Sequence, residues 1–352
     1  MKLPDFNITT EIENLALEIV EILEVMEKVG DIDLLFKLRR ASRISSIQSS
    51  VAIEANSLSL EQVTDIINGR KVVGDPREIL EVQNAWEAYQ GIGEYDPFSL
   101  DSFLTAHKRM SSKLVREAGC FRSVQVGVYK GLELIHEGAK PEEISGLMDR
   151  VFEWGLKSNA HPLIKSCAMH FLIEFVHPFE DGNGRMGRLW QTVILANWKP
   201  ILEWVPVETM VYQNQYGYYD ALHKSELLND AAPFVVFMLN IIAYTLGLIV
   251  RSKAVPPAER DKALVIPANV GVNVGVNVGV NVGVNEPVNE PVKRGLLKEL
   301  EKQPQLTAKE LAILLNKSSR TIERHLKELK ERGILERAGS DKSGYWRILK
   351  EL

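Results

Sequence analysis

The feature that most constrains this chain is the spacing of its apolar residues, which recur at intervals of three and four along most of residues 1–265. That interval is the period of an α-helix with one buried face. One segment differs: Phe121–Tyr129 alternates, is rich in valine and predicts a short β-hairpin or extended flap. The fold class is therefore mainly α. The expected helices are Ile12–Val29, Ile32–Arg43, Glu78–Tyr89, Leu100–Leu114, Pro141–Leu156, Ile164–Val176, Arg185–Asn197, Gln215–Leu228 and Pro233–Val250.

The last of these helices, Pro233–Val250, is about long enough to cross a bilayer. It contains Asn240, Tyr244 and Thr245, and we interpret it as a buried core helix rather than a membrane span. The N-terminal residues are acidic and polar, unlike a signal peptide. We therefore expect a cytoplasmic protein with no membrane partner.

Composition changes abruptly after residue 265. The tetrapeptide NVGV repeats four times and is followed by NEPVNEPV, so residues 266–291 are interpreted as a flexible linker. The alternative is a β-segment prone to edge pairing, because the valines alternate and the repeat carries no charge. The resulting division of the chain is an N-terminal helical region (1–110), a core (111–265), the linker (266–291) and a C-terminal module (292–352).

The C-terminal module has the pattern of a winged helix-turn-helix: three helices, then two short strands around the turn Ser340–Ser343. It carries 15 Lys and Arg against nine Asp and Glu, whereas the whole chain has a net charge of −5. That asymmetry is typical of a nucleic-acid-binding appendage. The alternatives are a solvated basic face or a protein contact. The candidate DNA-binding residues lie in its third helix: Ser319, Arg320, Thr321, Arg324 and Lys327.

The residues richest in chemistry form the run HPFEDGNGRMGR, from His177 to Arg188. Pro178 disfavours helical geometry at His177, so the preceding helix must end there. The glycine-rich turn that follows opens a new helix, whose free backbone N–H groups and dipole favour phosphate. Arg185 and Arg188 can add charge-assisted hydrogen bonds, and Asp181 can hold Mg²⁺. With His177 as a base that titrates near neutrality, the run indicates phosphoryl or nucleotidyl transfer.

This run resembles the Fic family signature, HPFx(D/E)GNGRxxR, at every specified position. The resemblance implies a Fic-type helical domain in which His177 deprotonates a hydroxyl that attacks the α-phosphate of ATP. It also implies that Asp181 binds Mg²⁺ and that Phe179 packs under the loop. The intact glycine turn favours AMP transfer over kinase-like chemistry. The ATP-binding residues it implies are Gly182, Asn183, Gly184, Arg185, Met186, Gly187 and Arg188.

Two further segments extend the resemblance. The first looks like the family's flap, a hairpin that clamps a target backbone by strand addition. An ordinary hairpin is the alternative. The flap residues are Phe121, Arg122, Ser123, Val124, Gln125 and Val126. The second, Tyr218 and Tyr219, is similar to the family's tyrosine pair beside adenine, and core aromatics on a helix are the alternative.

Residues 49–56, SSVAIEAN, resemble the inhibitory helix of class II Fic proteins, (S/T)xxxE(G/N), and we expect that helix around residues 44–56. Ser50 and Glu54 stand one helical turn apart on one face, and the resemblance implies that Glu54 pairs with Arg188. An arginine paired in this way is unavailable to the γ-phosphate. Ala55 departs from the pattern, which has Gly or Asn there, and this puts the local cap geometry in question.

The function these features predict is an autoinhibited protein adenylyltransferase that modifies a Ser, Thr or Tyr hydroxyl of a target protein and of itself. One alternative is a DNA-binding transcriptional regulator whose core senses nucleotide. Another is an enzyme that removes AMP at the same site. Fic relatives often dimerise, so a homodimer is a further expectation.

Overall fold

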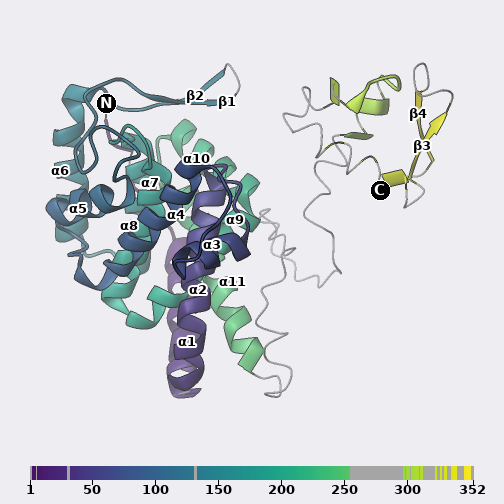
Figure 1. Ribbon diagram of the computed structural model, residues 1–352. Coiled ribbons are helices and arrows are strands. Elements are labelled where there is room, and N and C mark those ends of the chain that lie inside the picture. Colours follow the sequence, from purple (N-terminus) through teal and green to yellow (C-terminus); the bar gives the residue numbers. More distant parts are fainter. Residues whose placement is uncertain are drawn as a thin grey trace. The chain divides into compact units, whose positions relative to one another are not determined.

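The structure is a computed structural model, shown in Figure 1, in which two parts of the chain are described. The chain divides into two compact units, Met1–Ile266 and Pro267–Leu352. The first is described over residues 2–253, apart from 5, 30, 31, 131 and 132. The second is described at 296–297, 299–301, 303–308, 310–311, 322, 326, 329–330, 334–338 and 345–349. The NVGV repeat lies outside these residues.

The first unit is almost entirely helical, which confirms the predicted fold class. Two short 3₁₀ helices, η1 (Ile92–Glu94) and η2 (Pro200–Trp204), connect longer elements. The α-helices are α1 (Thr10–Val29), α2 (Ile32–Ile53), α3 (Leu60–Ile67), α4 (Pro76–Gln90), α5 (Leu100–Met110), α6 (Pro141–Lys157), α7 (Pro162–Val176), α8 (Asn183–Trp198), α9 (Val207–Gln213), α10 (Gln215–Leu228) and α11 (Ala232–Lys253).

Helices α7 and α8 form the centre of this unit, and the loop between them, with the first turns of α8, carries the His177–Arg188 motif. Nearly every side chain of both helices is buried. Helix α11 packs on α7 and α1, while α5 packs on α8 and α6 (Figure 1). The loop is therefore anchored at both ends in the hydrophobic core, which fixes the positions of its side chains.

Two short helices were not predicted. The apolar spacing ended the second helix at Arg43, and the rest of α2 was expected only from the resemblance, as an inhibitory helix around residues 44–56. Helix α3 begins with a capping box between Ser59 and Gln62, and α9 follows Pro206. Helix α2 continues past Arg43 to Ile53 through a run of serines that breaks the apolar spacing. These serines are buried against α9, where Ser46 Oγ donates to Glu208 Oε2 at 2.8 Å. Because this interface is polar, its residues do not show the apolar spacing by which a helix is recognised in a sequence.

The β-hairpin lies further along the chain than expected. Strand β1 (Gly127–Lys130) pairs antiparallel with β2 (Glu133–Glu137), so the strand predicted from Phe121 begins only at Gly127. The segment before it is irregular because its backbone bonds elsewhere: Arg122 N donates to Pro178 O. His136 on β2 connects the hairpin to α7, because its Nε2 lies 2.9 Å from Phe175 O.

Helix α11 is a core helix in this fold. It is the one helix among the described residues that is long and apolar enough to cross a membrane, over Ala232–Val250. Several of its large side chains, including Phe234, Met238 and Leu246, are completely buried in the same core as α7 and α8. That burial accounts for its apolar composition.

The second unit has its own hydrophobic core, formed by Leu296, Leu300, Leu306, Leu311, Ile322, Leu326, Leu329, Ile334 and Leu335. Strands β3 (Leu335–Ala338) and β4 (Tyr345–Ile348) pair antiparallel, as the predicted wing requires. A capping box is present: Glu310 N donates to Thr307 Oγ1, and Thr307 N donates to Glu310 Oε2. The predicted DNA-contact residues, 319–321, 324 and 327, lie outside the described residues.

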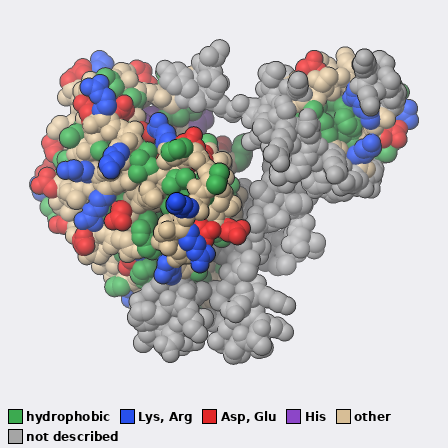
Figure 2. Space-filling view, in the orientation of Figure 1, with side chains coloured by type: hydrophobic (Ala, Val, Ile, Leu, Met, Phe, Trp, Pro, Cys, Tyr) green, Lys and Arg blue, Asp and Glu red, His purple; other side chains and the backbone are tan. Residues whose placement is uncertain are grey.

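Charge on the first unit is mixed. Figure 2 shows Lys and Arg side chains interspersed with Asp and Glu over the face in view. A mixed surface of this kind does not attract polyanions as a whole. Any attraction for phosphate must then come from a local arrangement of charged groups, and the loop between α7 and α8 supplies one.

Candidate active site

The backbone of His177 ends α7 in a strained conformation. Its φ is +54°, in the left-handed region, and its N–H still bonds to Ile173 O at 2.9 Å. Pro178 excludes the helical alternative, as the sequence predicts. Arg122 holds the turn in place, because its Nε donates to His177 O at 2.8 Å and its backbone N donates to Pro178 O at 3.0 Å. Strain at a non-glycine residue of this kind is characteristic of functional sites.

The hydrogen bond of the His177 imidazole shows which ring nitrogen can act as a base. Its Nδ1 lies 3.3 Å from Glu174 O, and because a carbonyl only accepts, Nδ1 carries the hydrogen. Nε2 therefore holds the lone pair. Burial, reinforced by the charge of His136, lowers the pKa of His177 to about 4. The ring can accept a proton at neutral pH without first losing one.

The turn after His177 is closed by Asn183. Its side chain bonds to both Phe179 N and Phe179 O at 2.9 Å, and Gly182 adopts φ +86°. Helix α8 begins at Asn183, immediately after this glycine. Asn183 can therefore offer phosphate its backbone N–H but not its side chain. Phe179 is fully buried beneath the turn, in the packing position the resemblance implies.

Arg185 provides a buried positive charge next to this turn. Its side chain is 3% exposed, and Nη2 lies 3.2 Å from Asp181 Oδ1. Its Nε and Nη1 have no hydrogen-bond partner among the described residues, and neither does Ser111 Oγ. A Cβ built on Gly182 would lie 3.2 Å from Ser111 Oγ and 3.6 Å from Arg185 Nη2. Buried donors without acceptors are costly, and phosphate oxygens are acceptors of the kind that these donors lack.

Asp181 is the candidate metal ligand. Its Oδ1 accepts from Gly182 N at 2.6 Å and from Arg185, while Oδ2 accepts from Arg77 Nη2 at 3.2 Å. Its side chain remains 40% exposed. Within the described residues no group of three His, Cys, Asp or Glu could hold a metal. A lone carboxylate fits Mg²⁺ when substrate phosphates supply further oxygens.

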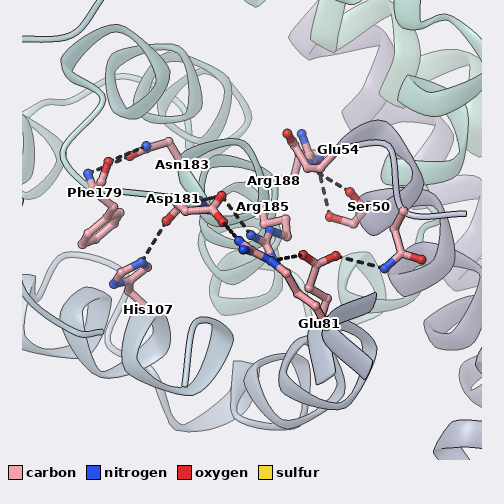
Figure 3. Close-up of polar contacts among 12 residues, drawn as sticks. Ser50, Glu54, Glu81, His107, Phe179, Asp181, Asn183, Arg185 and Arg188 are labelled. Atoms are coloured by element: carbon pink, nitrogen blue, oxygen red, sulfur yellow. Dashed lines mark hydrogen bonds and ion pairs between the residues drawn. The ribbon is translucent and has the colours of Figure 1, made fainter. Parts of the chain in front are cut away.

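Arg188 is paired with the segment predicted to be inhibitory. Its Nη2 donates to Glu54 Oε1 at 2.8 Å and to Ser50 O at 3.0 Å, and Nε donates to Ser50 Oγ at 3.2 Å (Figure 3). Burial, the largest single effect, would lower the pKa of Arg188, but Glu54, Tyr218 and Glu174 together outweigh it and the pKa is raised. Gly184 makes this approach possible, because a Cβ there would collide with Glu54.

The remaining residues of the motif differ in their surroundings. Met186 is fully buried in the core. Gly187 lies against His170, where a Cβ would meet the imidazole at 3.0 Å or closer. Both contribute packing rather than donors to a phosphate site.

Of the two tyrosines predicted to lie beside adenine, one is buried and the other is exposed. Tyr218 is 1% exposed, and its hydroxyl lies 3.1 Å from Glu174 Oε1 and 3.0 Å from His170 Nε2. Tyr219 is 47% exposed and packs edge-on against Tyr218. Only Tyr219 offers an accessible ring face, so the alternative of a core aromatic holds for Tyr218.

The predicted flap residues are mostly not free to pair with a target. Arg122 is 2% exposed and donates to three carbonyl oxygens, including Val124 O and Ala139 O. Ser123 bonds to Glu117, and Gln125 Nε2 donates to Gly138 O at 2.7 Å. Phe121 and Val126 are half-buried, and Val124 is exposed. Strands β1 and β2 form a two-stranded sheet, so each has one edge without a strand partner among the described residues.

Three residues of the site lie outside the motif and were not predicted: His107, Ser111 and Glu174. Burial raises the pKa of the Glu174 carboxyl to about 7, although Arg188 opposes the shift. Glu174 precedes His177 by one turn, a spacing that could have drawn attention to it. His107 and Ser111 come from the end of α5, and no local pattern distinguishes them there.

Comparison with known proteins agrees with this geometry. A model of the Fic/DOC family matches residues 97–195, and a model described as winged helix-turn-helix DNA-binding matches residues 290–336. Among curated proteins, the chain is 29% identical to a protein adenylyltransferase Fic of Aedes aegypti over 64% of its length, and 29% identical to protein adenylyltransferase fic-1 of Caenorhabditis elegans over 57%. It spans only 45% and 40% of those two proteins.

Solved structures extend the likeness. C. elegans Fic-1 (residues 134–508) shares the fold, with a TM-score of 0.57 at 23% identity, over 69% of this chain and 72% of the other. A Fic family protein from Desulfovibrio desulfuricans G20 matches with a TM-score of 0.67 and 33% identity. Since that match covers 99% of both chains, winged module included, the present protein belongs to the Fic family.

Proposed function

We propose that this protein transfers AMP from Mg-ATP to a hydroxyl side chain of a protein. The observation that carries the proposal is Arg185, buried at the start of α8 with two guanidinium nitrogens that lack acceptors, close to the equally unsatisfied Ser111. A phosphate in this position would satisfy both. The relatives named protein adenylyltransferase support the choice of reaction, although the chain spans less than half of them.

The chemistry follows from the positions of the side chains. His177 Nε2 removes the proton of the incoming hydroxyl, whose oxygen attacks the α-phosphorus of ATP. The bond from that phosphorus to the bridging oxygen breaks, and pyrophosphate leaves. Arg185 and the free N–H groups of α8 neutralise charge on the departing phosphates. Asp181 would hold Mg²⁺, which would neutralise further negative charge on the phosphates.

Intact-protein mass spectrometry tests this reaction. After incubation with Mg-ATP, the Glu54→Gly protein should gain the mass of one or more AMP groups, and the same protein carrying His177→Ala should gain none. A gain equal to a phosphate group would show kinase chemistry instead. An unchanged mass for Glu54→Gly, with or without an added cell lysate as a source of targets, would count against the proposal.

We also propose that Glu54 inhibits the enzyme. Its carboxylate bonds to the Arg188 side chain that the resemblance assigns to the γ-phosphate, and an anion there competes with phosphate by charge and by volume. Removing the carboxylate frees Arg188. We expect Glu54→Gly to raise self-labelling from ATP labelled at the α-phosphate, and Glu61→Gly on α3 to leave it unchanged. Equal labelling of the parent and Glu54→Gly would exclude inhibition by this contact.

A second function, DNA binding, is proposed for the C-terminal module. The match to a winged helix-turn-helix DNA-binding family and the excess of basic residues after 292 favour it. Fluorescence anisotropy with random duplex DNA at low salt should detect binding that weakens steeply as salt rises. The triple variant Arg320→Ala, Arg324→Ala, Lys327→Ala should bind more weakly. Parent protein that does not bind at low salt would rule this function out.

A further inference from the structure

The peptide group between Asp181 and Gly182 is held in one direction by a histidine outside the motif. His107 Nε2 lies 3.1 Å from Asp181 O (Figure 3). In a trans peptide the N–H points opposite to the C=O, so the Gly182 N–H points away from His107. It faces the charged side of the turn, where Asp181 Oδ1 accepts it at 2.6 Å and Arg185 Nη2 lies 3.2 Å from the same oxygen.

The hydrogen-bond partners of His107 allow only one tautomer of its ring. Gly119 N donates to its Nδ1 at 3.0 Å, and because an amide N–H can only donate, Nδ1 accepts and Nε2 is the donor to Asp181 O. Its ring is completely buried and stacks on Phe179, with centroids 3.6 Å apart and planes at 10°. Burial lowers the pKa of His107 to about 4, so the ring is neutral and keeps one donor and one acceptor.

Without such a restraint this peptide group could turn over easily. A flip changes ψ of Asp181 and φ of Gly182 together, and glycine accepts positive and negative φ almost equally. The flipped turn would direct the Asp181 carbonyl, rather than the Gly182 N–H, toward Arg185 and the phosphates. A carbonyl oxygen repels an anion, so the direction of this one group decides whether the turn attracts phosphate.

We propose that His107 is a positioning residue for nucleotide binding: by its hydrogen bond to Asp181 O, it aims the Gly182 N–H at the phosphate site. The inference rests on the proposed function, since it assigns the geometry of the same site. His107 also joins this turn to Gly119, which precedes the segment leading to the hairpin. His107 thus bonds both to the phosphate turn and to the segment that precedes the hairpin.

Three substitutions separate the two hydrogen bonds of His107. The amide of His107→Gln can place a donor near the position of Nε2 and retain the bond to Asp181 O. The shorter His107→Asn can place an acceptor near Nδ1 and retain only the bond from Gly119. His107→Phe keeps the stacked ring and loses both bonds. His161→Phe is the matched control, because His161 also accepts one backbone N–H, from Leu163, but lies at the start of α7.

The test is isothermal titration of the full chain with Mg-ADP, with the Tm of each variant measured alongside. ADP has no γ-phosphate, so the contact between Glu54 and Arg188 does not interfere. We expect His107→Gln to bind within about threefold of the parent, and His107→Asn and His107→Phe to bind roughly 10- to 100-fold more weakly, as loss of a hydrogen bond to a charged group predicts. His161→Phe should bind like the parent.

Equal affinity of His107→Gln and His107→Asn would overturn the inference, as would affinity that simply follows Tm across all four variants. The comparison of Gln with Asn decides the matter even when His107→Phe fails to fold. Parent protein that does not bind Mg-ADP would reject the proposed function itself. If the parent protein binds Mg-ADP but His107→Gln and His107→Asn bind it with equal affinity, only the role of His107 is rejected.

Discussion

At the scale of single residues, Ala55 is the position at which the inhibitory segment departs from the family pattern. The family pattern has Gly or Asn after the glutamate, and here Ala55 adopts φ +70°, a left-handed conformation that a Cβ disfavours. Asn56 compensates by bonding to Glu78 O at 3.1 Å and to Glu81 Oε2 at 2.9 Å. The end of α2 is therefore kept in place by its neighbours despite local strain.

Ala55→Gly should remove that strain. Glycine takes the same conformation without a steric penalty, so we expect stability to rise by about 0.5–1 kcal/mol, after the greater entropy of glycine in the unfolded chain is deducted. Urea denaturation measures the change. The matched control is Ala41→Gly, an exposed position in the interior of α2, where glycine should cost roughly 1 kcal/mol. A loss of stability for both variants would contradict the account.

Single residues also show how much of the site could be predicted from the sequence. The contiguous run from His177 to Arg188 was predictable because a turn between two helices brings its own neighbours together. Arg185 and Asp181 needed no long-range information for the same reason. His107, Ser111 and the true role of Arg122 were not predictable, because each reaches the turn from a distant segment and is identified only by a buried bond. Glu54 was predictable only through the resemblance.

At the scale of elements, one buried carboxylate bonds α2 to three other helices. Glu208 on α9 is 2% exposed and accepts from Ser46 Oγ on α2, Tyr89 OH on α4 and Thr192 Oγ1 on α8. The inhibitory helix is thus joined to the core by polar bonds as well as by apolar packing. This interface is what the apolar spacing of the sequence failed to indicate.

Glu208→Ala should leave three buried hydroxyl groups without their acceptor. We expect a loss of about 3 kcal/mol in the free energy of unfolding, and a smaller loss for Glu208→Gln, which keeps one accepting oxygen. Hydrogen exchange should rise in residues 44–53 of α2 more than in α10. An equal change of hydrogen exchange in α2 and α10 would show that the Glu208 carboxylate does not hold α2. Equal losses of unfolding free energy for Glu208→Ala and Glu208→Gln would show the same.

At the scale of the whole molecule, buried histidines make stability depend on pH. Burial lowers the pKa of His107 and His177 to about 4 and that of His170 to about 3. Unfolding returns each to about 6.5. Between pH 6.5 and 4 the unfolded chain therefore binds more protons, and stability falls as pH is lowered. Glu174, with its pKa raised to about 7, acts in the opposite direction but is one group against three.

We accordingly expect the Tm of the protein to fall when the pH is lowered from 7 to 5. Differential scanning calorimetry at constant ionic strength measures this. His170→Asn should flatten the dependence, because it removes one group whose protonation opposes folding while keeping a polar side chain. A Tm that is constant or rises toward pH 5 would mean that the buried rings are not neutral donors and acceptors in the folded state.

The central claim is that the loop between α7 and α8 directs attack at the α-phosphate of ATP. The most direct measurement incubates the Glu54→Gly protein with Mg²⁺ and ATP labelled with ³²P at either the α- or the γ-position, and follows label retained on protein. The account predicts retention from α-labelled ATP alone, and none when His177→Ala is added. Retention from γ-labelled ATP, or equal retention with and without His177, would contradict it.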